Sequence, residues 1–422
     1  MPLSQERYYK SLEAQRKLPE GFSGATSSFS FSSAERGAEE LTMNLSLIEL
    51  DSPSRAVAAV TTTNRFPGAP VILVREILRS GSPVAGILVN NKVANVGVPG
   101  GLDDAYRLTA ALEALSGKGS WVSLSTGVIG WRLPVEGMVE ELPALRAKRE
   151  TDRGVDLAEA IMTTDRYPKL KRVELGKGSI FGIAKGAGMI EPNLATMISV
   201  ILTDFELPRE ELSRLLLDSV EGSFNRIGVD GEQSTSDVVM LIASGRAGRV
   251  DSSAFGAALH EVTGELARQV VRNGEGTAHV LRVEVRGIAG EGKALYLARR
   301  VSNSPLVKSA IYGNDPNVGR ILMALGDGLS DLGDEASVEN LTIEIDGTAV
   351  FEAGHFVLDA EKERVLSESL RASAMDPALK GYPQHDRAVS IVVDFGDGSS
   401  GEAVYGSDLS YEYVRENADY RT

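Results

Sequence analysis

The chain has 422 residues, of which 42% are apolar and 24% are charged, a composition typical of folded globular proteins with a substantial core. Its net charge of −15 argues against binding to nucleic acid by neutralisation of phosphates. The complete lack of cysteine excludes disulfides, thiolate catalysis and metals held by cysteine.

The sequence also bears on metals, membranes and location. The four histidines are scattered and none forms a His-Glu-x-x-His pair, so we expect no metal site. No apolar run is long enough to span a membrane, and residues 1–22 resemble neither a signal peptide nor a transit peptide. We therefore expect a cytoplasmic protein without membrane partners.

In chain order, apolar periodicity predicts alternating strands and helices. For the first half we expect a helix at 5–17, a strand or loop at 23–34, strand-like runs at 42–50, 56–63 and 71–78, a strand at 85–89, a helix at 103–115, a strand at 121–125, a solvated charged stretch at 145–156 and a helix at 157–163. For the second half we expect strands at 180–184 and 197–202, helices at 206–220 and 255–271, a strand at 281–286, a helix at 304–312, and strands at 341–345 and 389–394 with a helix near 361–373. This order predicts an α/β fold with sheets flanked by helices.

Residues 287–293 have the Gly-x4-Gly-Lys spacing of a phosphate-binding loop. Ala294 stands where such a loop needs a hydroxyl to bind Mg²⁺, and residues 294–298 read as a strand instead of the required helix. We therefore predict a β-hairpin turn here.

The most informative stretch is Lys-Gly-Ala-Gly-Met-Ile-Glu-Pro-Asn-Leu-Ala-Thr-Met at residues 185–197, between two strand-like runs. A threonine hydroxyl held at the mouth of a strand, beside glycines and Lys185, is a candidate nucleophile, which indicates Thr196. A Gly-Pro turn with an incidental threonine is the alternative that the residues alone leave open.

This stretch resembles the signature of the ornithine acetyltransferase family, the bifunctional acetyl-transfer enzymes of arginine biosynthesis. Further matching segments lie at 126–130, 160–169, 223–237, 315–321 and 408–422. The first 100 residues match poorly, and the segment 90–101 departs clearly from the family pattern. Ser236 stands where the family usually has asparagine, and Val318 where it has tryptophan.

The resemblance implies a self-processing enzyme with a fold like that of N-terminal-nucleophile enzymes and aminopeptidases. The precursor would cut itself between Ala195 and Thr196, giving an alpha chain of residues 1–195 and a beta chain of residues 196–422 with Thr196 as its N-terminal nucleophile. The Thr126 hydroxyl and the Gly127 N–H would form the oxyanion hole. The remaining substrate contacts that the resemblance implies are Thr163, Lys185, Glu275, Asn417 and Thr422, together with Thr196 itself.

The implied reaction moves an acetyl group from N-acetylornithine to Thr196 and then to glutamate, by a ping-pong route that needs no cofactor. Its partners would be these small molecules and its own cleaved chains, in a heterotetramer of two alpha and two beta. Three alternatives remain open. The same machinery could act on a different N-acyl amino acid. If water takes the acyl group, the protein would be an amidohydrolase or aminopeptidase, and an inactive paralogue would be a scaffold.

Overall fold

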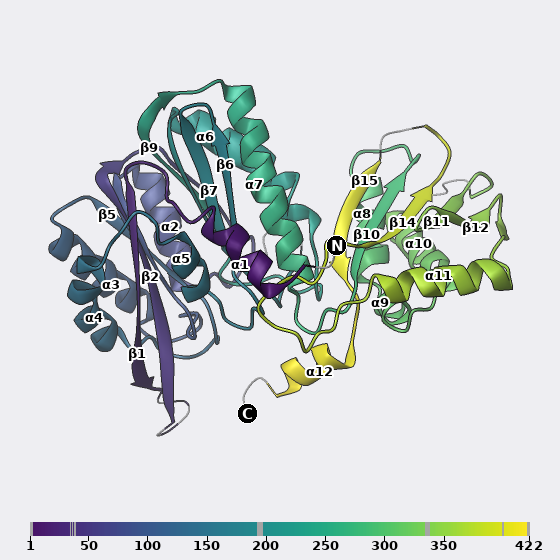
Figure 1. The fold of residues 1–422 in the computed structure, drawn as a ribbon, viewed down its shortest axis with the longest axis horizontal. Helices are drawn as coiled ribbons and strands as arrows, with labels where there is room; N and C mark the ends of the chain where they lie inside the picture. Colours follow the sequence, from purple (N-terminus) through teal and green to yellow (C-terminus); the bar gives the residue numbers. More distant parts are fainter. Residues whose placement is uncertain are drawn as a thin grey trace. The chain divides into compact units, whose positions relative to one another are not determined.

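The computed structural model describes residues 3–33, 35, 37, 39–191, 197–333, 338–398 and 401–419. The chain divides into two compact units. The larger unit contains Ser4–Asn225 and Glu232–Val270, and the smaller unit contains Met1–Leu3, Arg226–Gly231 and Val271–Thr422. Both units combine β-sheets with helices (Figure 1), so the predicted α/β class with sheets flanked by helices is confirmed.

The first sheet of the larger unit has four strands in the order β1-β2-β4-β5. Their bounds are Phe22–Ser32, Glu40–Ser54, Val84–Asn90 and Ser120–Ser125. β1 and β2 form a long antiparallel hairpin, whereas β4 and β5 are parallel and are connected through helix α3, Gly101–Ser116. α3 and α4, Val135–Ala147, cover one face of this sheet, and Leu47, Leu108 and Trp121 belong to the core between them (Figure 1).

The second sheet has five strands in the order β3-β9-β8-β7-β6. Their bounds, in chain order, are Val57–Thr61, Lys169–Leu175, Gly178–Lys185, Ile198–Glu206 and Val238–Arg249. Helices α6, Arg209–Glu221, and α7, Ser252–Arg272, follow β8 and β9 in the chain. α7 packs closely on β7, since a Cβ at Gly182 would lie 2.8 Å from Val262 Cγ1.

The predicted strand-connection-strand around the candidate nucleophile is confirmed for its two strands. β7 and β8 are antiparallel neighbours in which Lys185 pairs with Ile198. β8 is the central strand of the sheet, and its residues from Ile198 to Phe205 are buried, as expected for an apolar run. Ala195 and Thr196 themselves lie outside the described residues.

The other helices of the larger unit correct two predictions. They are α1 Gln5–Glu13, α2 Ala69–Ser80 and α5 Gly154–Ala160. The prediction of a strand-like run at 71–78 is wrong, because this stretch lies in α2. Pro70 occupies the first turn of that helix, and Gly81, with φ of +65°, ends it. α5 ends at Ala160, so Thr163 lies beyond the helix predicted at 157–163.

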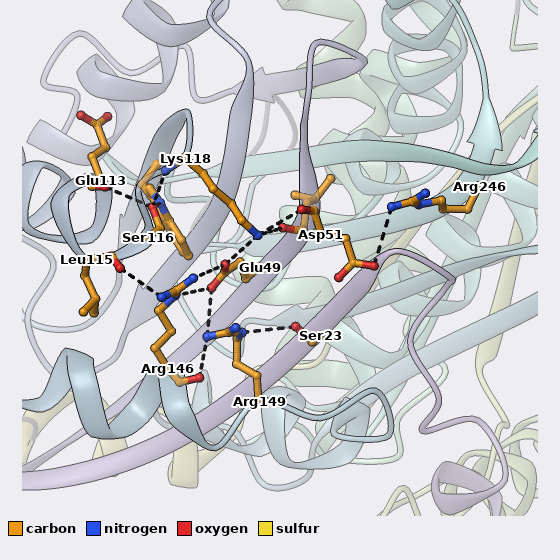
Figure 2. A network of polar contacts seen from close by, with 12 residues as sticks. Ser23, Glu49, Asp51, Glu113, Leu115, Ser116, Lys118, Arg146, Arg149 and Arg246 are labelled. Carbon is orange, nitrogen blue, oxygen red and sulfur yellow. Dashed lines mark hydrogen bonds and ion pairs between the residues drawn. The ribbon is translucent and has the colours of Figure 1, made fainter.

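The charged stretch at 145–156 is only partly solvated, which corrects a third prediction. Arg146 and Arg149 reach back to Glu49, a carboxylate on β2 that is 1% exposed (Figure 2). Arg146 Nε and Nη2 each lie 2.8 Å from a Glu49 oxygen, and Lys118 Nζ lies 3.2 Å away. Burial alone would raise the pKa of Glu49, but the hydrogen bonds from Arg146 and Lys118 and the charge of Arg149 hold that pKa below its usual range.

The smaller unit contains a six-stranded sheet in the order β13-β12-β11-β14-β10-β15. In chain order its strands are Val280–Arg286, Thr342–Ile345, Thr348–Glu352, His355–Phe356, Val389–Asp394 and Glu402–Ser407. Its helices are α8 Lys293–Asn303, α9 Pro305–Tyr312, α10 Val318–Leu332, α11 Ala360–Ala372 and α12 Tyr411–Ala418. Leu281, Leu297 and Ile391 belong to the core that these elements share.

The predicted hairpin turn at 287–293 is wrong, because a helix and not a strand follows it. Ala294, Leu297, Ala298 and Val301 are buried on one side of α8, which is the spacing of a helix and not of a strand. Gly292, with φ of +75°, precedes its first turn. The segment therefore joins a strand to a helix, as in a phosphate-binding loop, but Ala294 still supplies no hydroxyl for Mg²⁺.

Within the described residues, none of the helices combines the length and apolar character that crossing a membrane requires.

Candidate active site

The predicted oxyanion residues lie where β4 and β5 end side by side. Beyond these strands the chain continues as two parallel segments that hydrogen-bond to each other: the Thr126 N–H donates to the Asn90 carbonyl at 3.1 Å and the Val128 N–H to the Lys92 carbonyl at 2.9 Å. The Gly127 N–H lies between these two donors in the chain. It has no hydrogen-bond partner within the described residues, which suits a donor that awaits a ligand.

Only glycine fits at position 127. A Cβ there would lie 2.1 Å from the Lys92 carbonyl carbon and 2.3 Å from its oxygen, and the φ of +133° is one that other residues rarely adopt. Lys92 itself has φ of +70°. The buried Asn90 side chain holds both segments, because its Oδ1 accepts from Ser125 Oγ at 2.7 Å and its Nδ2 donates to the Val93 carbonyl at 2.9 Å. The divergent segment 90–101 thus supports the oxyanion segment directly.

Lys185 and Thr126 come together although 59 residues separate them. Lys185 ends β7, is 2% exposed, and donates from Nζ to Thr126 Oγ1 at 3.1 Å. An ammonium group carries only donors, so Thr126 Oγ1 is the acceptor in this contact. The Thr126 hydroxyl proton is then directed to some other acceptor, as an oxyanion donor requires.

Thr163 is held by a buried carboxylate that the sequence did not single out. Asp165 Oδ2 accepts the Thr163 N–H at 2.9 Å, while Oδ1 accepts the Gly186 N–H at 2.9 Å and pairs with Lys169 Nζ. The side chains of Asp165 and Lys169 are fully buried. Burial alone would raise the pKa of Asp165, but the positive charges of Lys169 and Lys185 hold that pKa far below its usual range.

A second buried carboxylate anchors the chain directly after the predicted cleavage site. Asp237, which precedes β9, is fully buried, and its Oδ1 accepts the Met197 N–H at 2.6 Å. Its Oδ2 has no hydrogen-bond partner among the described residues. Burial raises the pKa of Asp237 well above its usual range. This contact holds the residue that follows the candidate nucleophile in the chain.

The smaller unit brings together two of the predicted substrate contacts, 142 residues apart. Asn417 Nδ2, on α12, donates to Glu275 Oε2 at 2.9 Å. The approach is close: Gly276 has φ of +62°, and a Cβ there would lie 2.1 Å from the Tyr413 backbone nitrogen. Thr422 lies outside the described residues, as do Ala195 and Thr196.

The predicted site residues therefore form two described groups. Thr126, Gly127, Lys185 and Thr163 lie in the larger unit, and Glu275 and Asn417 lie in the smaller one. The sequence does not single out the buried polar side chains of Asp165, Lys169, Asp237 and Asn90. Among the described residues, there is no group of three histidine or carboxylate side chains that could hold a metal ion.

The sequence matches the model of the ArgJ family over residues 30–422. It is 37% identical over 419 residues to the arginine biosynthesis bifunctional protein ArgJ of Nitratidesulfovibrio vulgaris, an alignment that covers 96% of this chain and 99% of that protein. The chain belongs to the ArgJ family. The predicted resemblance is thereby confirmed, as is the prediction of an acyltransferase that moves acetyl groups in arginine biosynthesis.

Other members of this family and their structures are also similar. The glutamate N-acetyltransferase of Methanothermobacter thermautotrophicus is 37% identical over 378 residues, covering 86% of this chain and 90% of that protein. The crystal structure of the ArgJ protein from Bacillus halodurans superposes with a TM-score of 0.46 at 32% identity, over 52% of this chain and 98% of that chain.

Proposed function

We propose that this ArgJ-family chain cuts itself between Ala195 and Thr196 and then transfers an acetyl group from N-acetylornithine to glutamate through an acetyl-Thr196 intermediate. The observation that carries the proposal is the segment around Thr126 and Gly127, where the Gly127 N–H has no hydrogen-bond partner among the described residues and the Lys185 ammonium donates to the Thr126 hydroxyl. The similarity to the glutamate N-acetyltransferase of Methanothermobacter thermautotrophicus supports glutamate as the acceptor. N-acetylornithine as donor rests on the motif resemblance.

Cleavage begins when the Thr196 hydroxyl attacks the Ala195 carbonyl carbon, so that the acyl group moves from the Thr196 nitrogen to its oxygen. Water then hydrolyses the ester, leaving a carboxylate on Ala195 and an α-amino group on Thr196. An α-amino group titrates at about 7.7–8.0, so at neutral pH it can take the proton of its own hydroxyl as a general base. The Asp237 contact to the Met197 amide supports this step, because it holds the residue that follows the nucleophile.

In turnover, Thr196 Oγ attacks the acetyl carbonyl of the donor and a tetrahedral oxyanion forms. Thr126 and Gly127 would stabilise that oxyanion, an effect worth about 3–4 kcal/mol for each donor in other enzymes. Ornithine leaves, and the amino group of glutamate attacks the acetyl-Thr196 ester. No cofactor enters this sequence of steps.

We assign the remaining predicted residues to substrate binding. Lys185 and Thr163 would contact the amino-acid part shared by both substrates. Glu275 suits the cationic side chain of ornithine, and Asn417 and Thr422 can hydrogen-bond either ligand. We further propose an assembly of two alpha chains, residues 1–195, and two beta chains, residues 196–422, in the cytoplasm.

Hydrolysis is the alternative chemistry for the same site. The departures at 90–101 and at Ser236 from the family pattern keep open an amidohydrolase, or a transferase for another N-acyl amino acid. Acetyl transfer from labelled N-acetylornithine, measured with and without glutamate, separates them. Release of acetate that is independent of glutamate would favour the hydrolase.

The processing step has its own test. Purified protein should run as two bands, and the larger fragment should begin Thr-Met-Ile-Ser on Edman sequencing. The Thr196→Ala variant should remain one inactive chain, because both the attacking hydroxyl and the later nucleophile are removed. A fully active enzyme that stays a single chain would refute self-processing.

A further inference from the structure

A buried ion pair connects the residues predicted to bind substrate with those predicted to form the oxyanion hole. We propose that Asp165 and Lys169 are positioning residues that hold Lys185 against Thr126, and so set the direction of the oxyanion donor. The inference rests on the proposed function for the role of Thr126. It gives a role to Asp165 and Lys169, which lie in the matching segment 160–169 but have no role that the resemblance implies.

Asp165 accepts hydrogen bonds from two backbone amides, one directly after Lys185 and one at Thr163. Its Oδ1 accepts the Gly186 N–H at 2.9 Å, and that nitrogen is bonded to the carbonyl carbon of Lys185. Gly186 has φ of +153°, so β7 ends here with a turn that only glycine makes easily. Asp165 Oδ2 accepts the Thr163 N–H at 2.9 Å. One carboxylate therefore ties the start of the 185–191 segment to the turn that carries Thr163.

The charges of the pair give that contact its strength. Asp165 and Lys169 are four residues apart, and their fully buried side chains form an ion pair. A second buried cation, Lys185, also attracts Asp165. In this setting, loss of Asp165 would leave two buried ammonium groups without the carboxylate between them. Removing one partner of a buried ion pair is costly, so the pair holds Asp165 in place. Asp165 in turn holds the backbone next to Lys185, whose Nζ donates to Thr126 Oγ1.

A positioning role differs from a structural role in what it changes. If Asp165 acts through Lys185, its replacement displaces a donor in assembled sites and slows the chemistry. If it only supports the fold, its replacement lowers the number of assembled sites without slowing those that remain. A rapid-mixing experiment with labelled N-acetylornithine separates the two, because the burst amplitude counts sites and the burst rate constant reports acylation.

The experiment is a double-mutant cycle between Asp165→Asn and Lys185→Ala, with amplitudes expressed per cut chain. We expect Asp165→Asn to keep the burst amplitude and to lower the acylation rate constant by about 10- to 100-fold, as small misplacements of catalytic groups do. In the Lys185→Ala background the same change should cost less than about threefold, because the group it positions is already absent.

The matched control is Asp204→Asn. Asp204 is a buried carboxylate on β8, and its Oδ1 accepts the Ser179 N–H at 2.7 Å, but Ser179 lies near the opposite end of β7 from Lys185. Its replacement should leave the acylation rate constant unchanged. Should Asp165→Asn not fold, the pair Asp165→Asn with Lys169→Met removes both buried charges and is expected to show the same dependence on Lys185.

Two results would overturn the inference: equal rate losses from Asp165→Asn with and without Lys185, or a lower burst amplitude at an unchanged rate constant. If the wild-type enzyme itself gives no burst at Thr196, the proposed function fails and the inference fails with it. A wild-type burst combined with additive losses removes the inference alone.

Discussion

Replacing Gly127 by alanine should disable the oxyanion hole while leaving the rest of the fold in place. An alanine Cβ would lie 2.1 Å from the Lys92 carbonyl carbon, whereas ordinary contact begins at 3.4 Å, so the two segments must separate by about 1.3 Å. The φ of +133° adds backbone strain of roughly 1–3 kcal/mol. A movement of this size misdirects the Gly127 N–H, and we expect kcat to fall by about 10²- to 10³-fold.

The assay is acetyl transfer from labelled N-acetylornithine to glutamate at saturating substrate, with thermal unfolding measured in parallel. Gly130→Ala is the matched control, because Gly130 also has a positive φ, of +85°, but a Cβ there would meet nothing within 4 Å. That variant should be slightly destabilised and should keep its kcat within about threefold. If Gly127→Ala folds and retains the kcat of Gly130→Ala, the Gly127 N–H is not an oxyanion donor.

Three further predictions follow from individual contacts. Glu49→Gln should lower the free energy of unfolding by about 3 kcal/mol, since it leaves Arg146, Arg149 and Lys118 without their carboxylate. The control Glu113→Gln, at an exposed position nearby, should have no effect (Figure 2). Because the folded-state pKa of Glu49 is depressed, this difference should be complete above the unfolded pKa of about 4.3 and should disappear as pH falls through the folded pKa; a difference that persists in acid contradicts the assignment. The two cleaved fragments should co-elute in native buffer and separate only in denaturant, because the sheet neighbours β7 and β8, and likewise β3 and β9, come from different fragments; separation without denaturant would refute this. Glu275→Gln should reduce kcat/KM for N-acetylornithine roughly tenfold more than for N-acetylglutamate in the reverse reaction, and equal losses would remove Glu275 from recognition of the ornithine side chain.

The sequence predicts the elements best where the apolar period is long or the ends are marked. The helices at 103–115 and 255–271 and the strands at 180–184 and 197–202 correspond to α3, α7, β7 and β8. Short apolar runs are ambiguous between the two periods. At 71–78 and 294–298 the flanking residues decide for a helix, through Pro70 in the first turn of α2 and Gly292 before α8.

The candidate site is likewise only partly predictable from the sequence. Thr126, Gly127 and Lys185 stand in motifs, and the structure shows how Lys185 meets Thr126. Asp165 and Asp237 act on backbone amides, a role that leaves no periodic signal in the sequence. Their burial could not be foreseen either, because it depends on how β7, β8 and β9 pair. The Thr-Thr-Asp triplet that ends in Asp165 is the one signal that the sequence offers, and by resemblance it indicates only Thr163.

The proposed function requires a covalent acetyl group on Thr196. A brief pulse of N-acetylornithine without glutamate, followed by acid quenching, digestion and mass spectrometry, tests it most directly. We predict one added acetyl group on the peptide that begins at Thr196, and its loss when glutamate is added before the quench. If neither N-acetylornithine nor any other N-acetyl amino acid labels that peptide, the account of a Thr196 acetyltransferase is contradicted.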